Sequence, residues 1–117
     1  MIALLVIKTN QPEKQKTFYE NFDLIFQKEK HGKGPAHFSA LIKDQDIVFE
    51  IYPLPKSQPL PDSTTRLGFR VDNLRKTIEA ILEIGGEIKN EIRETNFGKF
   101  TVVKDFDGRS VEVYQKE

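Results

Sequence analysis

The strongest constraint on the fold is a short apolar segment with a central glutamate that occurs twice. Residues 48–52 read VFEIY and residues 110–114 read SVEVY, so Glu50 and Glu112 stand 62 positions apart. The same offset places residues 6–10 on residues 68–72, each a short apolar stretch followed by a residue suited to begin a helix. A period of about half the chain, held without insertion, predicts one supersecondary unit used twice.

Composition limits the class of protein. A chain of 117 residues suits one compact domain. Its 18 basic and 18 acidic residues cancel, which argues against nucleic acid or membrane partners. The absence of cysteine excludes disulfides, thiolate ligands and a cysteine nucleophile. Residues 1–7 are apolar but lead into Lys8, which predicts a first strand rather than a signal peptide, and a cytoplasmic protein.

The first half predicts a strand, a helix and three further strands. A well-buried strand is expected over residues 2–8, then a helix that Asn10 caps and whose apolar face includes Phe18 and Phe22. Another strand is expected over residues 24–30. His31 falls in a glycine- and proline-containing loop over residues 31–35, where we expect it to be solvated.

A hairpin of residues 37–42 and 47–52, turning at residues 43–46, completes the first half. Pairing outward from the turn sets Ser39 opposite Glu50. Alternation then gives one apolar face, expected to lie against the helices: Phe38, Ala40, Ile42, Phe49 and Ile51. The other face is mixed: His37, Ser39, Leu41, Val48, Glu50 and Tyr52.

The second half repeats the pattern after a proline-rich linker. A strand over residues 67–71 leaves Arg66 and Arg70 on the side away from the helices. Asp72 or Asn73 is expected to cap the next helix, whose apolar stripe comprises Leu74, Ile78, Ile81 and Leu82. A strand near residues 87–92 precedes a hairpin turning at residues 105–108. That turn predicts one shared face: Lys99, Thr101, Val103, Ser110, Glu112 and Tyr114.

These elements predict an α+β fold of two βαβββ modules in tandem within a single domain of residues 1–117. Module one spans residues 1–53, the linker 54–63 and module two 64–117. The helices cover one side of a mixed sheet. The other side gathers polar groups: Lys8, His37, Glu50, Tyr52, Arg66, Arg70, Glu112 and Tyr114.

Several motifs together resemble a known family. They are LGFRVDNL at residues 67–74, GGE at 85–87, FG at 97–98 and DFDG at 105–108, with TFYE at 17–20. The chain resembles the vicinal-oxygen-chelate superfamily, which includes glyoxalase I, bleomycin-resistance proteins and extradiol dioxygenases. The resemblance implies a cupped sheet that holds a small-molecule site and often pairs as a homodimer. It leaves the activity open, because this scaffold hosts enzymes and binding proteins.

The resemblance also implies four metal-ligand positions, which here are Leu4, Glu50, Arg66 and Glu112. The glutamates match, but leucine offers no ligand atom and arginine stays charged. A catalytic site generally needs three protein ligands, so we expect no cofactor and no metal. If a divalent ion (Ni, Zn, Mn, Co or Fe) binds, His37 would join Glu50 and Glu112 as ligands.

Three hypotheses remain. The first is a metal-free binding protein for a small molecule, an anion being one option. Glu50, Glu112 and His37 would orient the ligand or act as acid and base, and the remaining contacts would be Arg66, Arg70, Ser39, Tyr52, Thr101 and Tyr114. The second is a metal-dependent glyoxalase-like lyase or isomerase, or a dioxygenase. The third is a structural subunit with its glutamates neutralised by Arg66, whose polar face is only a dimer interface.

Overall fold

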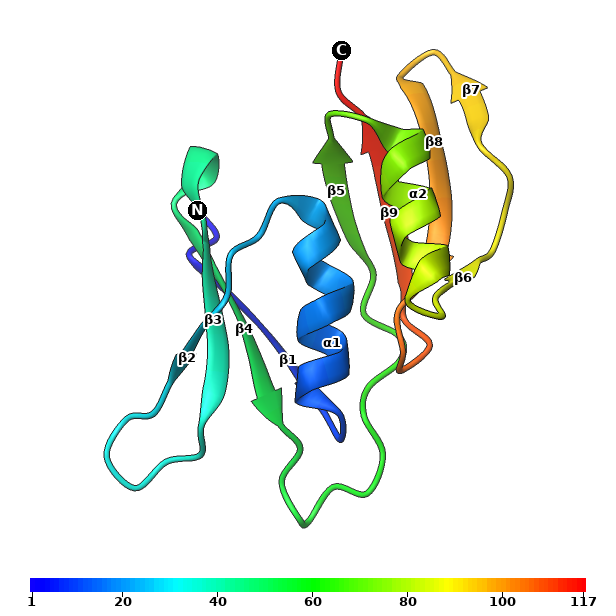
Figure 1. Cartoon of the computed structure of the whole chain (residues 1–117). Coiled ribbons are helices and arrows are strands. Elements are labelled where there is room, and N and C mark those ends of the chain that lie inside the picture. Colours follow the sequence, from blue (N-terminus) through cyan, green and yellow to red (C-terminus); the bar gives the residue numbers. More distant parts are fainter. The chain divides into compact units, whose positions relative to one another are not determined.

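The structure is a computed structural model that describes residues 1–117 and divides them into two compact units (Figure 1). The first unit comprises residues 1–20 and 24–62, and the second comprises residues 21–23 and 63–117. Each unit runs strand, helix and then further strands. This order agrees with the predicted α+β fold built from a repeated module.

The first sheet contains four strands in the order β1-β4-β3-β2. Their bounds are β1 (Leu4–Thr9), β2 (Gln27–Glu29), β3 (His37–Ile42) and β4 (Ile47–Pro53). Strand β1 runs parallel to β4, while β3 is antiparallel to both β4 and β2. Ser39 pairs with Glu50, so the predicted register of the first hairpin is confirmed.

Strand β1 is less buried than the apolar run of residues 2–8 suggested. Ile7 and Thr9 are 4% and 0% exposed, whereas Leu4 and Val6 on the opposite face are 52% and 41% exposed. Strand β1 lies at the edge of its sheet and contacts helix α1 (Pro12–Tyr19). The predicted well-buried strand is therefore wrong for one face, because successive side chains point to opposite sides.

Helix α1 begins without the predicted cap. Its N-cap is Gln11, which makes no side-chain capping bond, and the Gln11 N–H donates to Thr9 Oγ1 at 3.1 Å. The Asn10 amide donates instead to the Pro59 carbonyl, so the prediction that Asn10 caps the helix is wrong. The buried face includes Phe18 and Tyr19, whose rings meet edge to face. Phe22 follows in the short 3-10 helix η1 (Glu20–Phe22).

The second sheet repeats the first with one extra strand. It contains β5 (Leu67–Val71), β6 (Glu87–Ile88), β8 (Gly98–Lys104) and β9 (Ser110–Gln115), in the order β5-β9-β8-β6. Strand β7 (Arg93–Thr95) also pairs with β8, so the single strand predicted over residues 87–92 is shorter and is followed by a separate one. Gly68 pairs with Glu112 as Val6 pairs with Glu50, which confirms the repeat for these strands.

The register of the second hairpin differs from the prediction by one residue. Val102, not Thr101, lies opposite Glu112, and Thr101 lies opposite Val113. The loop between Lys104 and Ser110 contains five residues, whereas the corresponding loop of the first hairpin contains four. A slip of one residue turns a whole strand over. The prediction that Lys99, Thr101 and Val103 share a face with Glu112 is therefore wrong.

The additional loop residue is Arg109, which is held in a buried ion-pair cluster. Its Nη1 lies 3.1 Å from Asp105 Oδ2 and 3.1 Å from Asp107 Oδ2. The backbone N–H groups of Asp107 and Arg109 both donate to Asp105 Oδ1. With its side chain 1% exposed, Arg109 belongs to the interior of the loop rather than to the strand.

Helix α2 (Leu74–Glu83) is capped as one of the two alternatives predicted. Asn73 Oδ1 accepts the Lys76 N–H at 3.1 Å. Leu74, Ile78 and Ile81 are buried, but Leu82 is 49% exposed, so its assignment to the apolar stripe is wrong. Gly85 follows the helix with φ +89°, a conformation that glycine adopts without strain. Neither helix is long and apolar enough to cross a membrane.

Candidate functional site

The first unit buries a histidine at the start of β3. His37 is 2% exposed, and its ring stacks on Tyr52 with centroids 4.0 Å apart and planes 9° apart. Its Nδ1 lies 3.1 Å from the Pro35 carbonyl oxygen. Because a carbonyl can only accept, Nδ1 carries the proton, and this bond fixes the ring orientation.

Glu50 faces the other ring nitrogen. Glu50 Oε2 lies 3.3 Å from His37 Nε2, and the Glu50 side chain is 14% exposed. The predicted proximity of His37 and Glu50 is therefore confirmed. Ser39, another predicted ligand contact, is half-buried and pairs directly with Glu50 across the β3–β4 hairpin.

Tyr52 closes one side of this group. Partial burial raises the pKa of the Tyr52 phenol, and the nearby carboxylates of Glu50 and Glu29 raise that pKa further. The neutral phenol is thus favoured at physiological pH. It supplies a stacking surface and a hydrogen-bond donor beside the two carboxylates.

The second unit pairs its glutamate with arginine. Arg66 Nη2 donates to Glu112 Oε2 at 2.9 Å, which confirms the predicted proximity of Arg66 and Glu112. The Arg66 side chain is 61% exposed and that of Glu112 is 27% exposed. The pair therefore lies at an accessible surface of this unit.

Tyr114 completes the neutralisation of Glu112. Its hydroxyl donates to Glu112 Oε1, and this hydrogen bond is the main cause that raises the Tyr114 pKa. Partial burial and the Glu112 charge raise that pKa further, while Arg66 and Arg70 lower it. The ring also stacks on Phe100 with centroids 5.3 Å apart.

An open hollow of about 690 Å³ adjoins Tyr114 in the second unit. Arg70 and Tyr114, which are neighbours across the β5–β9 pairing, both line it. Phe97 is 88% exposed and also lines the hollow, although the sequence indicated only a loop at that position. The remaining lining residues are Gln115, Lys116 and Glu117.

The predicted site residues fall into the two units. His37, Ser39, Glu50 and Tyr52 lie together in the first, and Arg66, Arg70, Glu112 and Tyr114 lie in the second. A joint site of His37, Glu50 and Glu112 stays a prediction. Thr101 lies elsewhere: it is 1% exposed and donates to the Asn90 carbonyl, on the sheet face away from Glu112.

The residues present do not fit the metal centre that the resemblance implies. Leu4 has no donor atom, and the Arg66 guanidinium occupies one oxygen of Glu112 while Tyr114 occupies the other. A fixed cation bonded to a carboxylate competes directly with a metal for that ligand. In the second unit, arginine and tyrosine thus satisfy the glutamate.

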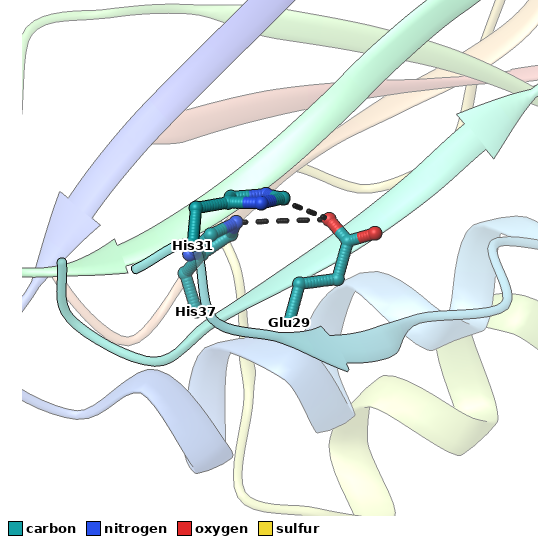
Figure 2. A group of neighbouring side chains, drawn as sticks. All are labelled: Glu29, His31 and His37. Atoms are coloured by element: carbon teal, nitrogen blue, oxygen red, sulfur yellow. Dashed lines mark ion pairs between the residues drawn. The ribbon is translucent and has the colours of Figure 1, made fainter. Parts of the chain in front are cut away.

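His31 was predicted to be solvated and is 71% exposed in its side chain, yet it has partners. Its ring centroid lies 5.1 Å from that of His37, and its Nε2 lies 3.8 Å from Glu29 Oε1. Figure 2 shows both imidazoles directed at this carboxylate. In the sequence, Glu29 and His31 are two residues apart and His37 follows the predicted loop. This spacing is the signal that could have indicated the cluster.

Comparison with family models identifies the superfamily of this chain. The Glyoxalase/Bleomycin resistance protein/Dioxygenase superfamily model matches residues 2–113, nearly the whole sequence. The protein belongs to this superfamily, and the predicted family resemblance is confirmed. A search of curated protein sequences found no match.

Solved structures agree with this fold at low sequence identity. TnmS3, an antibiotic-binding protein from Streptomyces sp. CB03234, is 16% identical with a TM-score of 0.73, covering 100% of this chain and 96% of that one. The fosfomycin resistance protein FosX from Mesorhizobium loti is 16% identical with a TM-score of 0.72, covering 100% and 92%. A glyoxalase I mutant from Zea mays is 18% identical with a TM-score of 0.77, covering 98% of this chain and 44% of the other. At these identities the likeness shows the fold alone.

Proposed function

We propose that this protein binds a small molecule carrying an anionic group, on the surface of the second unit that presents Arg66. The observation that carries the proposal is the exposed Arg66 guanidinium, held 2.9 Å from Glu112 and 61% accessible. A guanidinium has five N–H donors in a planar fork. One contact to Glu112 therefore leaves donors for a carboxylate or phosphate-type ligand.

The surroundings of Arg66 favour an anion over a cation. The Glu112 carboxylate already receives hydrogen bonds from Arg66 and Tyr114, so its charge is compensated within the protein. Arg70 stands across from Tyr114 and adds a positive charge at the hollow next to Tyr114. The exposed ring of Phe97 offers apolar contact for the rest of such a molecule.

The superfamily context supports a small-molecule ligand. Two of the similar structures are described as an antibiotic-binding protein and a fosfomycin resistance protein, and both share the fold of this chain. Such proteins show that the scaffold accommodates small molecules. The proposal that the ligand carries an anionic group rests on Arg66 and its neighbours.

Calorimetric titration with matched aromatic probes tests the proposal. We expect benzoate and phenylphosphonate to bind the protein and the neutral benzamide to bind much more weakly. Arg66→Gln should weaken the anions at least about tenfold, equivalent to about 1.4 kcal/mol. Arg75→Gln, which removes the same charge from an exposed position on α2, should leave their affinity unchanged. Equal loss of anion affinity in both variants would show that the anions bind only by non-specific charge attraction, which would contradict a site at Arg66.

A second candidate function is a metal-dependent glyoxalase-like lyase or isomerase, or a dioxygenase. The favouring observation is His37 Nε2, placed 3.3 Å from Glu50, because a histidine beside a carboxylate is an arrangement used for proton transfer in catalysis. Turnover of methylglyoxal adducts or catechols in the presence of divalent metal, abolished by Glu50→Gln, would establish it. Full turnover by Glu50→Gln would reject it.

We further propose that the chain forms a homodimer. Leu4, Val6 and Leu41 expose about half of their side chains on one face of the first sheet, and covering apolar surface favours association. Sedimentation equilibrium is the test. A dimer that dissociates on Leu4→Ser is expected, and a monomer at all concentrations would contradict it.

A further inference from the structure

We propose that Glu29, His31 and His37 form a binding site for a first-row divalent cation, with Zn²⁺ as the best match. The site belongs to the first unit and uses none of the four ligand positions that the superfamily resemblance assigns. It does not rest on the anion site proposed above, and it shares only His37 with the second candidate function. Its three side chains come from strand β2, the loop after it and the start of β3 (Figure 2).

The chain brings these residues together through one antiparallel pair. Glu29 ends β2 directly opposite His37, so the two side chains share a face of the sheet. The connecting loop turns back at residues 31–34, where the Gly34 N–H donates to the His31 carbonyl at 2.9 Å. This turn leaves the His31 ring 5.1 Å from that of His37.

The distances suit a shared ion better than direct bonds. His37 Nε2 and His31 Nε2 lie 3.6 Å and 3.8 Å from the same oxygen, Glu29 Oε1, beyond hydrogen-bond length. One ligand atom from each residue lies within 4.8 Å of the others. A tetrahedral Zn²⁺ with bonds of about 2.0–2.2 Å holds its ligand atoms about 3.3–3.6 Å apart. Small side-chain movements would therefore close the site.

The tautomer of His37 points to a cation. Nδ1 donates to the Pro35 carbonyl, the outer bond that orients many metal-binding histidines. In the neutral ring, Nε2 then carries a lone pair. That nitrogen is buried without a hydrogen-bond partner, yet oxygens of Glu50 and Glu29 lie 3.3 Å and 3.6 Å away. A lone pair facing two carboxylates is unfavourable unless a positive charge stands between them.

That positive charge is either a second proton on His37 or a metal ion. A proton on Nε2 would explain only why this nitrogen of His37 faces two carboxylates. A metal also explains why His31, from a separate loop, directs its Nε2 to the same Glu29 oxygen. Two imidazoles with one carboxylate are ligands typical of zinc and of the neighbouring transition metals, whereas calcium and magnesium prefer oxygen ligands only.

Metal analysis of untagged, chelator-stripped protein after dialysis against Zn²⁺ tests the site. We expect one Zn²⁺ per chain, with affinity reduced at least tenfold by His31→Asn or Glu29→Gln. Both residues are partly exposed, so these variants should fold, unlike one at buried His37. Glu79→Gln removes an exposed carboxylate on α2 and should bind as the unaltered protein does.

Histidine side-chain NMR of the Zn²⁺-loaded protein provides an independent readout. Metal binding predicts that Nε2 of both histidines loses any attached proton, while His37 Nδ1 keeps its own. No bound zinc, or unchanged affinity in both variants, would overturn the proposal. So would zinc binding lost in Glu112→Gln but retained in His31→Asn, because the ion would then occupy another site.

Discussion

Arg66 and Glu112 lie 2.9 Å apart although 46 positions separate them in the sequence. The parallel pairing of β5 with β9 brings them together, since Arg66 immediately precedes β5 and Glu112 lies within β9. Both positions correspond to metal ligands in the superfamily resemblance. Here a permanent positive charge on the protein stands beside the glutamate, and in the proposed function this charge would contact the anionic ligand.

The two arginine ion pairs should differ sharply in their contribution to stability. Arg66→Gln removes an exposed pair and should change the free energy of unfolding by only about 0.2–1 kcal/mol. Arg109→Gln leaves two buried carboxylates without their cation and should cost about 3–5 kcal/mol. Urea denaturation of both variants measures the difference. Similar losses would show that burial does not distinguish the pairs.

Tyr114 should titrate above the usual tyrosine range because its hydroxyl donates to Glu112. Its raised pKa means that the folded state holds the proton more tightly than the unfolded state. The associated stability is present below the unfolded pKa of about 10 and is lost as pH rises through the folded pKa.

Carbon-13 NMR of the tyrosine rings measures this pKa directly. Glu112→Gln should bring the Tyr114 pKa down, because the charged acceptor has gone, and should leave Tyr52 in the other unit unchanged. An unaltered Tyr114 titration in that variant would show that the hydrogen bond to Glu112 is not the cause.

Two asparagines provide a matched test of helix capping. Asn73 accepts a backbone hydrogen bond at the start of α2, so Asn73→Ala should lower the free energy of unfolding by about 1 kcal/mol. Asn10 precedes α1 but makes no such bond, and Asn10→Ala should cost clearly less. Thermal unfolding followed by circular dichroism compares them. Equal costs would indicate that Asn10 also caps.

Thr101 tests the register of the second hairpin. It is buried on the face away from Glu112, so Thr101→Val should leave anion affinity unchanged. The loss of its hydrogen bond to the Asn90 carbonyl should lower the free energy of unfolding by about 1 kcal/mol. Reduced anion affinity at unchanged stability would instead favour the register expected from sequence.

Sequence pattern predicted the elements whose determinants are local. The duplicated segments around Glu50 and Glu112 gave the module repeat, and alternation with a four-residue turn gave the Ser39–Glu50 register. The register predicted for the second hairpin is wrong because the sequence pattern assigned Arg109 to the strand. Its ion pairs with Asp105 and Asp107 hold it in the loop instead, and strand alternation alone does not distinguish a five-residue loop from a four-residue one.

The candidate site was likewise predictable only where strand pairing determines the contacts. Pairs that share neighbouring strands, such as His37 with Glu50, follow from register. The approach of His31 to Glu29 depends on how the loop after β2 turns back, which residue pattern alone does not specify. The exposure of Leu4 likewise depends on which face of β1 receives the helix.

The most direct test of the proposed function is an NMR titration of nitrogen-15-labelled protein with phenylphosphonate, following the arginine side-chain signals. The proposed anion site predicts saturable shifts of the Arg66 and Arg70 signals, no comparable shift of Arg75 on α2, and loss of the response in Arg66→Gln. Shifts spread evenly over the exposed arginines, or saturable shifts that leave Arg66 unaffected, would contradict an anion site at Arg66.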